Sequence, residues 1–149
     1  MKSNYLISIV GATGIGKTSL SIKLAKHFDA EIISSDSRQF YKEMCIGTAV
    51  PNKEELQQAT HHFIQDRSIF EDYSVGDFER DAIDKLNGLF KKHNIVVMVG
   101  GSGLYVDAVL KGLDDFPDIE PEIRENLKEE LQTNGIEFIQ QRLKELDPV

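Results

Sequence analysis

Residues 11–18 read Gly11-Ala12-Thr13-Gly14-Ile15-Gly16-Lys17-Thr18. This stretch matches the phosphate-binding pattern G-x-x-x-x-G-K-[ST] in full, and it separates a strand predicted over residues 5–10 from a helix predicted over residues 17–28. Its glycines let backbone N–H groups turn towards phosphate oxygens, while Lys17 neutralises negative charge and the Thr18 hydroxyl is a ligand for Mg²⁺. We therefore predict that the whole stretch forms a phosphate-binding loop (P-loop), with Thr18 at the metal.

The segments around this loop alternate between strand and helix patterns. Apolar runs predict buried strands at residues 5–10, 31–34 and 95–99. Apolar residues at steps of four predict two helices whose core faces carry Leu20, Leu24 and Phe28 and Phe78, Ala82, Leu86 and Phe90. This alternation predicts an α/β fold, a P-loop NTPase-like parallel sheet with helices on both faces. Ligands bind at the carboxyl ends of the strands in such sheets.

Local signals place the remaining helices. Asn52 with Glu55 forms a capping-box pattern that opens a polar helix towards Thr60, and Ser74 with Asp77 repeats that pattern. A further helix is predicted to begin near Leu104.

The pattern changes after Gly112. A turn is predicted at residues 114–117, a helix begins at Pro121 and stops at Gly135, and a second helix follows. Residues 1–113 therefore form the sheet-based core, and residues 114–149 begin a helical region outside the sheet.

The bulk composition is that of a globular protein with an acidic balance. The 149 residues are 40% hydrophobic and 28% charged, and the net charge of −8 weakens any general attraction to nucleic acid. The first apolar run is too short for a signal peptide or a membrane span, and the single cysteine excludes an internal disulfide. We expect a cytoplasmic protein without membrane association, in which Cys45 is a small buried residue.

Polar residues follow two of the other strands. A P-loop NTPase usually carries an aspartate after a hydrophobic strand, but the strand over residues 95–99 ends in two glycines. The acid is instead Asp36, after the second strand, where a base for an acceptor substrate and a simple turn aspartate both fit the pattern. Ser102 follows the two glycines just before a helix, and by itself this segment fits a plain turn better than a second anion site.

Histidine and arginine residues need separate interpretations. His61 and His62 are adjacent, but no cysteine or acid stands at ligand spacing, so a contact with a helix end is preferred over a metal site. Arg124 lies in the first turn of a predicted helix, where a cation opposes the helix dipole and therefore needs another role.

Together these motifs resemble those of the tRNA dimethylallyltransferase (isopentenyltransferase) family. The P-loop is similar to the family's G-x-T-x-x-G-K-[ST], residues 36–41 to its D-S-x-Q-x-Y, and residues 44–51 to its M-x-I-G-T-A-x-P. Paired histidines follow, as at His61 and His62, and residues 73–78 and 100–105 also have counterparts. The family commonly has threonine where Ser102 stands, which keeps the hydroxyl. Because many enzymes share the P-loop, the segment from residue 36 to 51 is the specific part of the resemblance.

The resemblance implies transfer of a dimethylallyl group from dimethylallyl diphosphate to the exocyclic N6 amine of an adenine beside the tRNA anticodon. It implies catalytic roles for Asp36 as the base, Ser102 near the reacting centre and Lys17 at the diphosphate, with Mg²⁺ as the cofactor. The implied tRNA contacts are Asp36, Ser37, Arg38, Gln39, Ser102 and Arg124.

Members of this family are considerably longer than this chain, so we expect a partial copy that is weakly active or inactive alone. Residues 1–113 would be its diphosphate-binding core and residues 114–149 the start of its tRNA-binding helical region. The anticodon stem-loop would bind through the full-length protein, expected to be a monomer.

Three alternatives stay open at this stage. A small P-loop kinase would bind ATP and should carry an arginine-rich lid. An adenylate isopentenyltransferase would use the same donor on a free nucleotide. A non-catalytic nucleotide-binding module would need only the P-loop.

Overall fold

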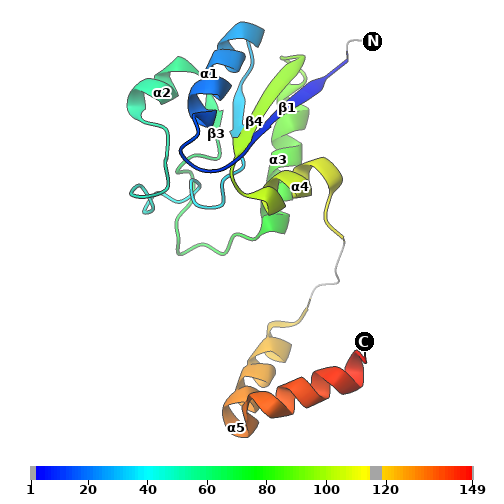
Figure 1. Cartoon of the computed structure of the whole chain (residues 1–149). Coiled ribbons are helices and arrows are strands. Elements are labelled where there is room, and N and C mark those ends of the chain that lie inside the picture. The colour runs from blue at the N-terminus through cyan, green and yellow to red at the C-terminus, as the bar shows by residue number, and fades with distance from the viewer. Residues whose placement is uncertain (1–2, 115–118, 149) are drawn as a thin grey trace. The chain divides into compact units, whose positions relative to one another are not determined.

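The computed structural model describes residues 3–114 and 119–148 (Figure 1). The chain divides into two compact units, Met1–Leu113 and Asp114–Val149. The first unit contains the sheet, and the second contains a long helical segment. Most of the turn predicted at residues 114–117 lies outside the described residues.

A parallel sheet forms the centre of the first unit. Its described strands are β1 (Tyr5–Val10), β2 (Ile32–Ser34), β3 (His61–His62) and β4 (Ile95–Gly100). They run in the order β1-β4-β2-β3, and each neighbouring pair is parallel. The strand before the P-loop, β1, therefore lies beside β4, which lies beside β2. The three strands that precede the predicted site residues are thus neighbours.

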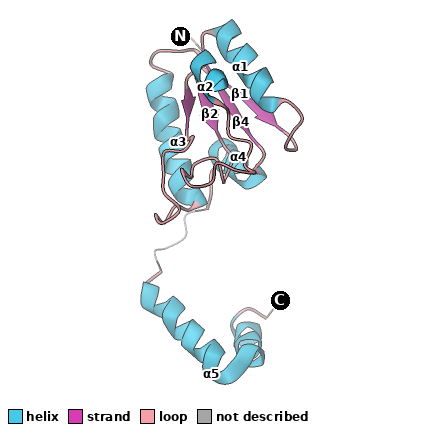
Figure 2. Ribbon diagram, turned by 90° about the vertical axis from the view of Figure 1, so that its left-hand side faces the viewer, coloured by secondary structure: helices cyan, strands magenta, loops and turns pink. Residues whose placement is uncertain are grey.

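Helices cover both faces of this sheet, which confirms the predicted α/β architecture (Figure 2). The helices of this unit are α1 (Lys17–Phe28), α2 (Lys53–Gln58), α3 (Val75–Leu89) and α4 (Gly103–Lys111). Adjacent residues of β4 point to opposite faces, so that Val97 packs with the α1 side and Met98 with the α3 and α4 side. Both faces are apolar, as expected for a parallel sheet covered twice.

The helix after the P-loop buries only part of the face that was predicted, since Leu24 is partly buried against the core. Leu20 and Phe28 are exposed, and the buried positions are instead Ser21, Ile22 and Ala25. Because α1 starts directly from the P-loop, the loop sets the rotation of the helix about its axis. The small residues on the buried side let the helix lie close to the sheet.

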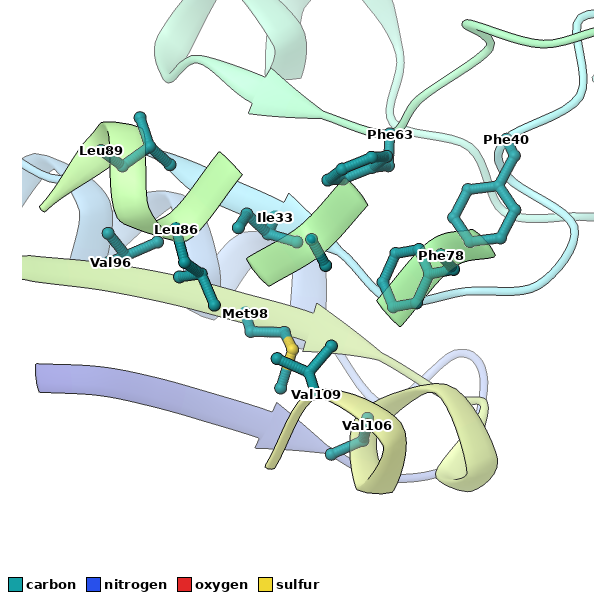
Figure 3. Packing of buried hydrophobic residues seen from close by; sticks show 11 residues of the cluster. Ile33, Phe40, Phe63, Phe78, Leu86, Leu89, Val96, Met98, Val106 and Val109 are labelled. Carbon is teal, nitrogen blue, oxygen red and sulfur yellow. The ribbon is translucent and has the colours of Figure 1, made fainter. Parts of the chain in front are cut away.

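A second core lies on the opposite face, between the sheet and α3 with α4 (Figure 3). The predicted stripe of α3 is buried at Phe78, Ala82 and Leu86, whereas the last position shifts from Phe90 to Leu89 at the end of the helix.

Aromatic rings extend this core towards the site. The Phe40 ring is fully buried and stacks on Phe78 with a centroid separation of 5.3 Å. Phe63 meets the Phe78 ring edge-on at the same separation, 5.3 Å. Phe40 thereby anchors the segment that follows Asp36 to the core.

The paired histidines lie in the short strand β3, and His61 makes the predicted contact with a helix end: its Nδ1 lies 2.8 Å from the carbonyl oxygen of Ala59, the C-cap of α2. The polar helix ends at Gln58, and Ala59 has the extended backbone angles φ −155° and ψ 149°. His61 and His62 then pair with Ile32 and Ile33 of β2. A strand of two residues is too short to show a sequence pattern that separates it from the end of the polar helix.

Cys45 is exposed, which corrects the prediction that it is buried. It lies in a surface loop where the neighbouring Ile46 has 93% of its area exposed. The single cysteine carried no pattern that could have told a loop from a core position.

The second unit contains α5 (Pro121–Leu146), which Gly135 interrupts with backbone angles of φ 79° and ψ 173°. The predicted stop at Gly135 is thus confirmed as a break between two helical segments. An ion pair between Arg142 and Glu130 joins the two segments across this break. Leu127 and Leu143 line a common apolar groove.

Candidate active site at the strand ends

The P-loop leaves the first turn of α1 open to a ligand. Gly14 and Gly16 have positive φ values of 84° and 91°, which favour glycine because a side chain would be strained there. Gly16 is the N-cap of α1 and offers no side-chain hydrogen bond to the helix start. The free N–H groups of the first turn and the helix dipole are therefore available to an anion.

Lys17 lies back along its own loop. Its Nζ donates a hydrogen bond to the carbonyl oxygen of Ala12 at 2.7 Å. This bond holds the ammonium group beside the loop. A phosphate bound by the loop would therefore lie close to this positive charge.

Asp36 follows β2 and is half-buried. Its Oδ1 accepts a hydrogen bond from the backbone N–H of Arg38 at 3.1 Å. Asp36 is therefore in a turn, and the same carboxylate also lines the pocket of the P-loop. The two interpretations left open by the sequence are both compatible with this geometry.

Ser102 links the end of β4 to the segment after Asp36. Its Oγ accepts a hydrogen bond from the backbone N–H of Ser37 at 3.0 Å and donates one to the Ser37 Oγ at 3.1 Å. Although Ser102 is the N-cap of α4, its side chain makes no capping bond to that helix. The hydroxyl therefore serves the site and not the helix.

Three strand ends converge around Gly101, directly after β4. A Cβ added at Gly101 would lie 3.6 Å from the Gly11 carbonyl oxygen and 4.0 Å from Asp36 Oδ2. Gly101 thus lies between the loop after β1 and the loop after β2. The predicted catalytic residues Lys17, Asp36 and Ser102 belong to these three adjacent loops.

Two pockets meet at this point. The first has a volume of about 360 Å³ and is lined by the P-loop with Lys17 and Thr18, by Asp36 and by residues 49–51. The second, of about 260 Å³, is lined by Ser37, Arg38, Ser102 and residues 47–48. Thr13 and Asp36 line both pockets.

Comparison with known proteins identifies the family of this chain. Residues 39–149 match the sequence profile of a family described as IPP transferase. The chain belongs to the IPP transferase family. The resemblance inferred from the motifs is therefore confirmed.

Relatives within the IPP transferase family cover nearly the whole chain. A tRNA dimethylallyltransferase of Flavobacterium psychrophilum is 68% identical over 144 residues, 97% of this chain and 47% of the relative. One of Christiangramia forsetii is 66% identical over 146 residues, covering 98% of this chain and 48% of the relative. The chain thus spans about half the length of the curated relatives that it matches.

Solved structures have the same fold. The tRNA isopentenylpyrophosphate transferase of Bacillus halodurans matches with a TM-score of 0.72 and 34% identity, over 99% of this chain and 48% of that one. A eukaryotic dimethylallyltransferase acting on tRNA matches with a TM-score of 0.80 and 28% identity, over 98% of this chain and 36% of that one.

His61 lines a pocket, which was not predicted from the sequence. It lines the first pocket, and its Nδ1 contacts the Ala59 carbonyl oxygen at 2.8 Å. Burial lowers the pKa of His61, although the bond to Ala59 opposes this shift. The Nε2 atom is buried and has no hydrogen-bond partner among the described residues. The paired-histidine motif was the available signal, and it predicted the contact with the helix end at Ala59 but not the place of His61 in the pocket.

The predicted magnesium site would offer few protein ligands. Among residues 3–114 and 119–148, no three His, Cys, Asp or Glu side chains gather as a metal site. A magnesium ion at a P-loop needs few protein ligands, since substrate phosphates and waters complete its shell. Thr18 at the first turn of α1 and the Asp36 carboxylate line one pocket, which fits such an ion.

The remaining predicted contacts lie in both units. Arg38 is exposed at the second pocket, whereas Arg124 is exposed on α5 in the second unit. Within the described part of the chain, no helix is both long and apolar enough to cross a membrane.

Proposed function

We propose that the chain carries the donor site, and part of the acceptor site, of a tRNA dimethylallyltransferase. The bond between the dimethylallyl carbon and the diphosphate oxygen breaks, and a bond from that carbon to the N6 amine of an adenine forms. The adenine amine loses one proton, and diphosphate leaves with the electron pair. The acceptor adenine would lie beside the anticodon of a tRNA.

The P-loop is the proposed binding site of the diphosphate leaving group. Its open N–H groups, the α1 dipole and the Lys17 ammonium supply positive potential where negative charge develops. When Mg²⁺ is bound, with Thr18 as its protein ligand, the ion would neutralise further charge on the leaving group.

Asp36 is the proposed base for the acceptor. The lone pair of an exocyclic adenine amine is delocalised into the ring, so removal of its proton helps the new C–N bond to form. The Asp36 carboxylate lines both the P-loop pocket and the pocket with Ser37, Arg38 and Ser102. This shared position is the observation that carries the proposal, because one carboxylate lies beside both the proposed donor pocket and the proposed acceptor pocket.

The tRNA substrate is inferred from the relatives, which are named tRNA dimethylallyltransferases. This naming favours the tRNA enzyme over a small P-loop kinase or an adenylate isopentenyltransferase. The expected contacts to the anticodon stem-loop are Ser37, Arg38, Ser102 and Arg124, together with Asp36. A monomeric state and a cytoplasmic location remain predictions.

Calorimetry tests the donor site directly. Diphosphate or dimethylallyl diphosphate with Mg²⁺ should bind the chain, and Lys17→Ala should weaken binding by about tenfold or more, because a charge-assisted contact to the anion is lost. Lys23→Ala, on the exposed side of the same helix, should change little. Steady ATP hydrolysis without diphosphate binding would contradict the proposal.

A further inference from the structure

One short loop lines both pockets of the site. Gly47 and Thr48 line the pocket with Ser102, whereas Ala49, Val50 and Pro51 line the pocket of the P-loop. We call residues 47–51 the dividing loop. Its position sets how far a group in one pocket lies from a group in the other, with Asp36 common to both.

The backbone of the dividing loop is not in a relaxed conformation. Gly47 and Ala49 have positive φ values of 78° and 51°. Ala49 has a Cβ and is strained in this left-handed region, so its conformation persists only where the surroundings enforce it. The Thr48 Oγ1 donates to the Met44 carbonyl oxygen at 2.6 Å, which fixes the beginning of the loop.

The side chain of Gln39 supplies the other restraint. Its Nε2 donates to the carbonyl oxygens of Thr48 at 3.1 Å and Ala49 at 3.0 Å. Its Oε1 accepts a hydrogen bond from the Ser34 Oγ at 3.0 Å, and Ser34 is only 1% exposed at the end of β2. Both amide hydrogens are thus committed to the loop, and the amide oxygen is committed to the sheet.

We propose that Gln39 is a positioning residue that ties the dividing loop to β2 and so fixes the donor pocket relative to the acceptor pocket. This differs from the direct tRNA contact that the family resemblance implies for Gln39. An amide that already uses both donors on Thr48 and Ala49 has none left for the edge of a base. The proposal rests on the proposed function, since it gives the two pockets their roles.

Gln39→Glu is the decisive variant. Glutamate has the same shape and can still accept from Ser34, but it has no donor for Thr48 and Ala49 and turns an anion towards their carbonyl oxygens. The matched control is Gln57→Glu, the same substitution at an exposed position on α2. Gln39→Met, which removes the three bonds without adding charge, serves if the glutamate variant does not fold.

Two measurements separate positioning from contact. Hydrogen–deuterium exchange of the peptide spanning residues 44–51 should become faster in Gln39→Glu and Gln39→Met but not in Gln57→Glu. In the natural protein that contains this chain, the Gln39 variants should lower kcat about tenfold to a hundredfold, because small displacements of reacting groups have effects of this size. The KM for the tRNA should change by less than about threefold.

The opposite pattern would overturn the proposal. If exchange at residues 44–51 is unchanged while the KM for the tRNA rises at constant kcat, Gln39 contacts the tRNA directly. Absence of any transfer by the unmodified natural protein would contradict the proposed function instead. In that case the exchange comparison would still decide whether Gln39 holds the dividing loop.

Discussion

Gly100 ends β4 directly against the segment that follows β2. A Cβ added there would lie 2.3 Å from the Ser35 Oγ and 2.5 Å from the Ser35 carbonyl oxygen. Ser35 is fully buried, and its N–H bonds the Val99 carbonyl oxygen at 2.8 Å, so its backbone has little room to move. The close approach of the two strands therefore depends on glycine at this position.

Gly100→Ala should lower the free energy of unfolding by about 1–3 kcal/mol, as overpacking of a core does. Urea unfolding of the chain measures this effect. The control is Gly88→Ala in α3, where an added Cβ meets no atom within 4 Å, and where alanine should stabilise the helix by about 0.5–1 kcal/mol. Equal stability of Gly100→Ala and the unmodified chain would contradict the predicted clash.

Asp36→Asn should depress transfer without affecting the donor site. The amide oxygen of asparagine can still accept the bond from the Arg38 N–H, so the turn is retained, but the base is lost. In the natural protein that contains this chain, the transfer rate should fall about a hundredfold or more, with little change in diphosphate affinity. Single-turnover rates and calorimetry measure the two quantities.

The matched control for this variant is Asp66→Asn, which changes an exposed aspartate on a surface loop. A large loss of diphosphate binding in Asp36→Asn, with a normal rate at saturation, would make Asp36 an organiser of the metal or the phosphate.

At the scale of single residues, the sequence predicted those features that depend on contacts between sequence neighbours. The two capping boxes, at Asn52 and at Ser74, depend on neighbours within a few positions and occur in the structure as predicted. Residues 11–16 also join β1 to α1 as predicted. The hydrogen bond between Ser102 and Ser37 joins residues that are distant along the chain, and the one from Gln39 to Thr48 joins two residues in irregular loop segments. No periodicity or spacing reports such contacts, so the role of Gln39 could not be predicted.

At the scale of elements, the edge strand β3 is a strand that no sequence pattern predicted. Two residues are too few to show an alternation, and the strand directly follows a short helix. Its attachment to the sheet involves a side-chain cluster as well as the backbone. Glu31, just before β2, bonds His62 Nε2 at 2.6 Å and His93 Nε2 at 3.2 Å through its two carboxylate oxygens.

This cluster predicts a stability that falls in acid. Partial burial alone would raise the pKa of Glu31, but the bonds and charges of His62 and His93 offset it and lower the pKa below its usual value of 4.5. A lowered pKa means that the unfolded chain binds more protons, so the contribution of Glu31 is present above pH 4.5 and is lost as pH falls through the folded-state pKa.

Urea unfolding between about pH 6 and pH 3 tests this dependence. Glu31→Gln should be less stable than the unmodified chain at the upper end, and the difference should shrink towards the lower end. Glu129→Gln, which changes an exposed glutamate of α5, should show no such trend. A constant difference between Glu31→Gln and the unmodified chain across this range would exclude the cluster as its source.

At the scale of the whole molecule, the local charge at the proposed donor site differs from the charge of the chain as a whole. The strand ends of the first unit gather positive potential at one small loop, whereas the chain as a whole carries a net charge of −8. In the proposed reaction, a diphosphate would need only these local groups because it is small. A tRNA stem-loop exposes many phosphates, which require Lys and Arg over a wide surface.

The chain alone should therefore bind diphosphate but hold an anticodon stem-loop weakly. Relative to a full-length tRNA dimethylallyltransferase, of which it spans about half, its affinity for the stem-loop should be at least about tenfold lower at low salt, because fewer phosphates are neutralised. Fluorescence anisotropy with a labelled stem-loop measures the affinity, and calorimetry with diphosphate on the same sample shows that the first unit is folded.

Flipping a base out of the anticodon loop costs a few kcal/mol that the contacts to the stem-loop must offset, so prenylation by the chain alone should also be slow. Tight stem-loop binding together with transfer at the rate of the full-length relative would show that residues 1–149 already contain the tRNA site.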